Sequence, residues 1–114
     1  DTDYLYPSLT SVGLAHRVRG APAPAVLVCG HSHIPFARRI GGTLVVNCGS
    51  VGRPVDGDPR GSLALLEVTG AGRLRARIMR IAYEVERTVA ALGERRVPGA
   101  VPAEYVRGVK RDGA

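Results

Sequence analysis

The chain has 114 residues, of which 45% are apolar, 15 are glycine and 8 are proline, so it suits one small domain with many turns. Its net charge of +6 favours acidic partners, but the basic residues are scattered and aromatic residues are few. We therefore expect nucleic acid not to be the main partner. No apolar run approaches the roughly 18 residues of a membrane span, and the two cysteines form no Cys-x-x-Cys pattern. A cytoplasmic protein with reduced thiols and no membrane contact is the expectation.

The first elements in chain order are a short helix and an apolar strand. Residues 1–7 suggest a loop, and residues 11–18 suggest a short helix that is followed by two prolines, Pro22 and Pro24. Residues 25–29 read Ala-Val-Leu-Val-Cys, a continuous apolar run. Such a run predicts a strand that is covered on both faces.

A hairpin and a long loop follow. Residues 36–40 and 43–47 are strand-like, and the Gly41-Gly42 pair between them predicts a type I′ turn, which needs positive φ at both positions. Residues 48–61 are rich in glycine and proline and form a long loop. Loops of this length inside a compact domain are usually either functional or disordered.

The last third of the sequence predicts a second pair of strands and two helices. Residues 62–68 form one strand, and residues 73–78 alternate between arginine and apolar residues, as a half-buried strand does. The arginine stripe is expected to face solvent. Residues 83–92 suit a helix that Gly93 ends, and a further short helix is expected from Pro102 to about Val109.

Two of the three histidines follow the apolar strand directly, in the sequence Gly30-His31-Ser32-His33. In extended backbone, residues two apart point the same way, so both imidazoles would face one metal ion or two neighbouring ones. Gly30 would let the backbone turn tightly at the strand end. A His-x-His pair is also a common surface feature, but its place after a strand and glycine favours a metal site. His16 lacks this setting and is expected to be structural or exposed.

The loop after the hairpin contributes the remaining candidates. Asn47 and Ser50 are expected to shape the loop by hydrogen bonds. The Gly49 to Gly52 stretch either offers backbone N–H groups to a phosphate or packs beside the histidines. Asp56 and Asp58 are interpreted as turn residues rather than as an acid pair. Cys29 is interpreted as a small core thiol rather than as a nucleophile.

The segment from Val26 to Pro35 resembles the last metal-binding motif, Gly-His-x-His, of calcineurin-like metallophosphoesterases. Residues 47–52, Asn-Cys-Gly-Ser-Val-Gly, are similar to the sequence that follows this motif in the small bacterial and archaeal branch of the family. The resemblance covers residues 25–92 and implies that residues 1–114 form the C-terminal part of one domain, with residues 93–114 as a tail. The implied fold class is α/β (α+β): the C-terminal half of a four-layer α/β/β/α sandwich, with mostly antiparallel strands and C-terminal helices.

The same resemblance implies a phosphoesterase that hydrolyses a phosphodiester or phosphomonoester with a metal-activated water at a dinuclear centre. His33 would bind one metal ion and His31 the other. The implied cofactors are two divalent ions, manganese first, with iron, nickel and zinc open. The site-shaping loop would comprise Gly30, Asn47, Gly49 and Ser50. The implied partner is a phosphorylated small molecule or a phosphodiester, and a homo-oligomer stays open.

The other ligand motifs of that family, Asp-x-His, Gly-Asp-x-x-Asp and Gly-Asn-His, do not occur in the sequence. We therefore expect the chain to be a piece of a longer enzyme and to be inactive by itself. Two alternatives stay open: a non-catalytic scaffold or binding module with the same fold, and a basic nucleic-acid-binding fragment.

Overall fold

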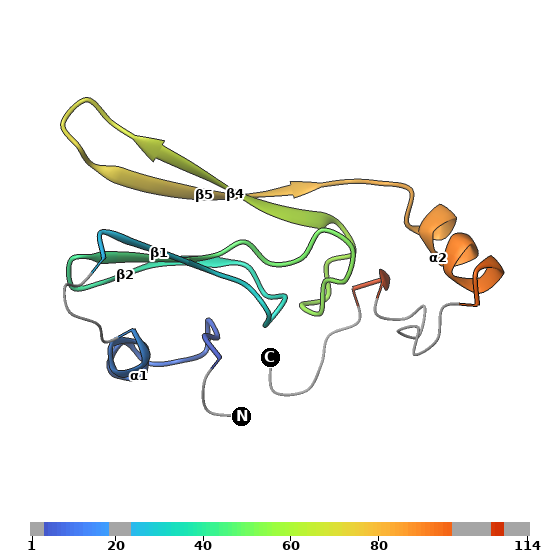
Figure 1. The fold of residues 1–114 in the computed structure, drawn as a ribbon, viewed down its shortest axis with the longest axis horizontal. Helices are drawn as coiled ribbons and strands as arrows, with labels where there is room; N and C mark the ends of the chain where they lie inside the picture. Colours follow the sequence, from blue (N-terminus) through green and yellow to red (C-terminus); the bar gives the residue numbers. More distant parts are fainter. Residues whose placement is uncertain (1–3, 19–23, 97–105, 109–114) are drawn as a thin grey trace.

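The computed structural model describes residues 4–18, 24–96 and 106–108. Two β-sheets lie one above the other, and helix α1 (Ser11–Arg17) packs on the opposite side of the first sheet from the second (Figure 1). Helix α2 (Val85–Glu94) follows the second sheet at one end of the molecule (Figure 1). The fold is thus a mixed α/β arrangement with mostly antiparallel strands, as the sequence predicts.

The first sheet has the strand order β1-β3-β2, from β1 (Val26–Cys29), β3 (Thr43–Asn47) and β2 (Phe36–Ile40). β3 lies in the centre, pairs in parallel with β1 and antiparallel with β2, and all five of its residues are buried. β1 is an edge strand, and Val28 is 52% exposed. The exposure of Val28 shows that the prediction that β1 is covered on both faces is wrong, because an apolar run does not reveal whether both faces of a strand are packed.

The hairpin between β2 and β3 forms at the predicted glycine pair, where Ile40 is paired with Thr43. Gly41 has φ of 57°, whereas Gly42 has no positive φ. A positive φ at the first central position alone matches type II′ rather than the predicted type I′.

Helix α1 closes the core on one face of the first sheet. The Thr10 side chain caps the helix by accepting a hydrogen bond from the Gly13 N–H at 3.1 Å. Leu14 is fully buried and packs against Phe36 and Val45. His16 is exposed, in agreement with the sequence.

The second sheet is a hairpin of two long strands, β4 (Gly61–Val68) and β5 (Leu74–Ile81). β4 lies where it is predicted, and β5 starts close to its predicted position but extends beyond residue 78. Burial alternates along β5, and Arg75 and Arg77 are exposed as predicted. Several large apolar side chains of this hairpin are also exposed, namely Leu65, Leu66, Val68, Met79 and Ile81.

Helix α2 runs to Glu94, so the prediction that Gly93 ends it is wrong. Arg95 is the C-cap, and Arg96 adopts the positive φ of 44° that glycine usually provides after a helix. The second expected helix, from Pro102 to about Val109, lies almost wholly outside the described residues. Within the described part of the chain, no helix combines the length and apolar character needed to cross a membrane.

Candidate metal-binding site

Both histidines of the Gly30-His31-Ser32-His33 segment adopt left-handed backbone, with φ of 68° at His31 and 59° at His33. The prediction of extended backbone through this segment is therefore wrong. The Ser32 N–H donates to the Gly30 carbonyl at 2.9 Å, which closes a three-residue γ-turn around His31. A γ-turn with a positive central φ is rare and strained. Strained backbone conformations persist only where the surrounding structure stabilises them, and they are more common at functional sites.

Gly30 does not supply the unusual backbone that the sequence assigned to it. It has no positive φ, and a Cβ placed on it would meet no atom within 4 Å. Its carbonyl, rather than its conformational freedom, contributes to the turn, because it accepts the Ser32 N–H. The strained position is one residue later, at His31.

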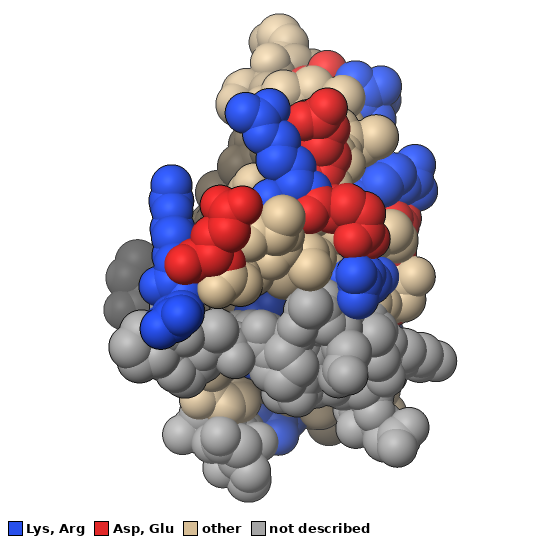
Figure 2. Space-filling view, turned by 90° about the vertical axis from the view of Figure 1, so that its right-hand side faces the viewer, with Lys and Arg blue, Asp and Glu red and all other residues tan. Residues whose placement is uncertain are grey.

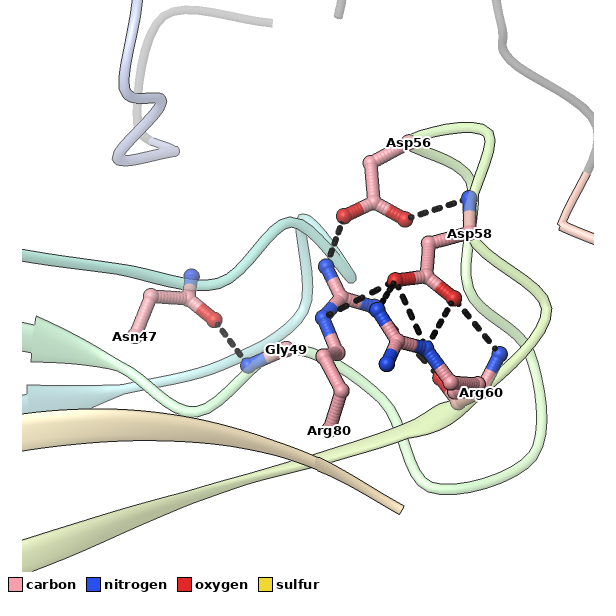
Figure 3. A network of polar contacts seen from close by, with 6 residues as sticks. All are labelled: Asn47, Gly49, Asp56, Asp58, Arg60 and Arg80. Carbon is pink, nitrogen blue, oxygen red and sulfur yellow. Dashed lines mark hydrogen bonds and ion pairs between the residues drawn. The ribbon is translucent and has the colours of Figure 1, made fainter. Parts of the chain in front are cut away.

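The Asn47 side chain stabilises this turn by hydrogen bonds. It is fully buried at the end of β3, and its Nδ2 donates to the Gly30 carbonyl at 3.1 Å and to Ser32 Oγ at 2.8 Å. Its Oδ1 accepts the Gly49 N–H at 2.9 Å, as the dashed line in Figure 3 marks. One amide thus joins the histidine turn to the following loop, and its buried polar atoms are satisfied.

The His33 imidazole is oriented by the same loop. Its Nδ1 lies 2.8 Å from the Arg53 carbonyl oxygen. A carbonyl can only accept a hydrogen bond, so this contact requires a proton on Nδ1, and in the neutral form of the ring the lone pair is then on Nε2. A histidine that donates one ring N–H to a carbonyl is the usual arrangement of a metal ligand.

The His31 ring stacks on Tyr4, with ring centroids 4.2 Å apart and an interplanar angle of 22°. The segment that carries Tyr4 is tied to β2, because the Arg38 guanidinium donates to the Leu9 carbonyl at 2.6 Å. Sequence reasoning missed Tyr4, since the contact joins residues far apart in the chain. The only signal was a pair of tyrosines, Tyr4 and Tyr6, in the N-terminal stretch.

The loop that carries the Arg53 carbonyl is closed by two hydrogen bonds of Ser50. Ser50 Oγ accepts the Arg53 N–H at 2.9 Å, and the Ser62 N–H donates to the Ser50 carbonyl at 2.9 Å. Gly49 has φ of 75°, and a Cβ there would lie 3.0 Å from side-chain atoms of Pro35 and Ser62. This glycine is therefore required both for its backbone conformation and for close packing.

An ion-pair cluster fastens the far end of the loop to β5 (Figure 3). Arg80 forms an ion pair with Asp56, and its Nε lies 3.8 Å from Asp58. Both aspartates accept a backbone N–H two residues on, as predicted for turn residues. The Arg60 side chain and backbone N–H both bond to Asp58 and lower its pKa to about 2.

Arg80 is a second residue that sequence reasoning missed. The arginine stripe at 73, 75 and 77 occupies one face of the strand, whereas position 80 falls on the other face. The available signal was that 80 is an even position, whereas 73, 75 and 77 are odd. Arg80 is accordingly half-buried while Arg75 and Arg77 are exposed.

Cys29 lies beside the histidine turn with its Sγ 3.5 Å from the Val46 carbonyl oxygen. Burial raises the pKa of the Cys29 thiol, and the neighbouring Cys48 raises it further. The group therefore stays a thiol at neutral pH, which argues against a nucleophile. Both cysteines are free.

Two imidazoles fit the chemistry of a divalent metal site, but they do not complete one. Among the described residues, no group of three or more His, Cys, Asp or Glu side chains is placed to hold a metal ion. His31 and His33 can therefore supply at most part of a ligand set.

The face of the molecule that carries α2 bears acidic and basic side chains next to one another (Figure 2). Glu84 pairs with Arg87 at 3.2 Å, and Glu86 pairs with Arg107 at 2.9 Å. The basic groups of this face are thus partly neutralised, which a nucleic-acid-binding surface would not favour.

Residues 8–71 match the family model of the calcineurin-like phosphoesterase superfamily domain. No curated protein matches the chain significantly. The crystal structure of a hypothetical protein from Pyrococcus horikoshii OT3 superposes with a TM-score of 0.73 at 18% sequence identity, covering 94% of this chain and 41% of that one. At this identity the likeness concerns the fold, and the chain spans about two fifths of that protein's length.

Proposed function

Since this chain belongs to the calcineurin-like phosphoesterase superfamily, we propose that it takes part in the metal-dependent hydrolysis of a phosphodiester or phosphomonoester. The family match covers more than half of the chain, including the histidine turn and the loop after it. The observation that supports metal dependence is the contact of His33 Nδ1 with the Arg53 carbonyl, because in the neutral ring it leaves the Nε2 lone pair for a metal ion.

In this proposal His31 and His33 each contribute one neutral imidazole. Divalent ions, when bound, would activate water and neutralise charge on the phosphoryl oxygens. This chain's own part is orientation: the Asn47 amide fixes the turn, the Arg53 carbonyl fixes the His33 ring, and Tyr4 packs on the His31 ring. The remaining ligands would come from outside the described residues.

Several finer assignments belong to the same proposal. Two ions, with manganese ahead of iron, nickel and zinc, would match the family. Residues 1–114 would form the C-terminal part of one domain whose core is residues 25–92. A phosphorylated small molecule or phosphodiester would be the substrate, in the cytoplasm.

The metal assignment can be tested on the chain itself by NMR. Long-range ¹H–¹⁵N spectra above the pH of imidazole titration should report His33 as the Nδ1–H tautomer. Paramagnetic Mn²⁺ should then broaden the ring signals of His31 and His33 at concentrations that leave His16 sharp. Equal broadening at exposed His16, or an Nε2–H tautomer at His33, would contradict the assignment.

The activity requires the full natural protein. His31→Ala and His33→Ala should each reduce hydrolysis of bis(4-nitrophenyl) phosphate at saturating Mn²⁺ by at least about 100-fold, the upper end of the effect of losing an outer-shell partner. His16→Ala, on the exposed face of α1, is the matched control and should retain wild-type turnover. Wild-type turnover in either ligand variant would favour the non-catalytic scaffold instead.

A further inference from the structure

The rings of His31 and His33 are oriented by different kinds of contact. His33 has a hydrogen-bonding partner, because its Nδ1 lies 2.8 Å from the Arg53 carbonyl oxygen. The His31 ring forms no hydrogen bond to any residue in the described part of the chain, and it stacks on Tyr4 instead. A metal-binding histidine usually donates its second ring N–H to a partner that fixes the ring. Tyr4 therefore fixes the His31 ring where a hydrogen bond would otherwise do so.

The stack covers a face of the His31 ring rather than its edge. The ring centroids are 4.2 Å apart and the planes are 22° from parallel. The lone pair of a neutral imidazole lies in the ring plane, so a metal ion approaches in that plane and not from the face. His31 is exposed, whereas Tyr4 is half-buried. Stacking thus restricts the ring without blocking the direction from which a metal ion would bind.

Tyr4 belongs to a segment that is anchored to the first sheet and to α1. Leu5 and Leu9 pack against the buried core between α1 and this sheet. The Arg38 guanidinium of β2 donates to the Leu9 carbonyl at 2.6 Å and to the Pro7 carbonyl at 3.5 Å. The Tyr4 ring therefore has a defined position relative to the histidine turn.

The chemistry of the two rings favours the stack most when His31 binds a metal ion. An imidazole that binds a divalent ion loses electron density to it and becomes partly positive. The face of a phenol ring is negative and attracts positive charge. A contact that is stronger in the bound state than in the free state raises the affinity for the ligand.

We propose that Tyr4 is the positioning residue of His31: it holds the imidazole by stacking and raises the affinity of this histidine for a divalent ion. The inference rests on the proposed function, in which His31 is a metal ligand. His33 has a different orienting contact, so it serves as the reference within the same molecule.

The test follows the ring signals of both histidines by NMR in the full chain, above the pH of imidazole titration. Tyr4→Leu removes the aromatic face and keeps apolar bulk, whereas Tyr4→Phe removes the hydroxyl alone. Without metal, the His31 ring protons should be shifted upfield by the Tyr4 ring in the wild type and in Tyr4→Phe, and not in Tyr4→Leu.

Titration with Zn²⁺, which is diamagnetic, then measures affinity at each ring through its ¹⁵N shifts. Tyr4→Leu should need about 2- to 5-fold more Zn²⁺ at His31, the size of a cation–π contact at an exposed site, with no change at His33. Tyr4→Phe should stay within about 2-fold of the wild type. Tyr6→Leu, in the same segment, is the matched control and should leave His31 unchanged.

The inference alone is overturned if Zn²⁺ shifts both rings but Tyr4→Leu binds it at His31 as tightly as the wild type. Equal weakening at His31 and His33, or the same weakening in Tyr6→Leu, would also overturn it, because the effect would then be general. A wild-type chain in which Zn²⁺ shifts neither ring would contradict the metal proposal itself and this inference with it.

Discussion

The end of β3 and the β4–β5 hairpin differ in whether their buried polar side chains form hydrogen bonds. At the end of β3, Asn47 is fully buried and uses both ends of its amide in three hydrogen bonds. At the base of the hairpin, the buried hydroxyls of Ser62 and Tyr83 have no partner among the described residues. Further along the hairpin, Val68 is 72% exposed.

This difference separates a part whose geometry is fixed by buried hydrogen bonds from a part in which such bonds are missing. A saturated buried network resists rearrangement, because each broken bond leaves an unsatisfied group. Unpaired buried hydroxyls hold no neighbour in place, and exposed apolar side chains such as Val68 favour association with another surface. Substitutions in the two regions should therefore differ first in stability.

Asn47→Ala should have the largest effect. It removes the side chain that links Gly30, Ser32 and Gly49, and we expect a loss of roughly 3 kcal/mol or more in the free energy of unfolding. Urea denaturation measures the loss. Thr43→Val, which removes one buried hydroxyl bond of the same strand, should cost only about 1 kcal/mol. Equal losses would mean that the Asn47 network is not cooperative.

Gly49→Ala should come second. The left-handed backbone costs about 1–2 kcal/mol for alanine, and contacts at 3.0 Å with Pro35 and Ser62 add roughly 1 kcal/mol of overpacking. Gly42→Ala is the control, since a Cβ there meets no atom within 4 Å. The comparison fails if both variants unfold at the same urea concentration.

The sequence predicts the regular elements well because their signals are local. Apolar runs, alternation and a glycine pair locate all five strands and both described helices to within a few residues. The histidine turn is different. His31 has a left-handed φ, and the Asn47 amide that bonds to the neighbouring Gly30 carbonyl is sixteen positions away, so no local pattern predicts this turn. The Tyr4 contact and the Arg80 ion pair are long-range for the same reason.

Arg80→Met should have a moderate effect on the hairpin side of the comparison. It leaves the half-buried Asp56 carboxylate without its guanidinium, and we expect a loss of about 1.5–3 kcal/mol. Arg77→Met on the same strand faces solvent and should change stability by less than about 0.5 kcal/mol. Similar thermal midpoints for both variants would mean that the ion pair of Arg80 contributes little to stability.

The pH dependence of Asp58 should be the smallest effect. Its pKa in the folded chain is about 2, below its ordinary value of 3.8. The folded state therefore binds fewer protons, so this stabilisation is complete above about pH 4 and is lost as the pH falls towards 2. Urea denaturation at several pH values should show this component in the wild type and not in Asp58→Asn. An unchanged slope in the variant would refute it.

The γ-turn at His31 affects how the thermal stability of the chain can be increased. A strained backbone that favours glycine makes a histidine there a cost to folding, whatever its chemistry. A laboratory selection for thermal resistance alone should therefore drift towards glycine at this position. A selection that also requires catalysis should keep histidine at this position and accumulate stabilising substitutions at other positions. The variants from the two selections should therefore differ first at residue 31.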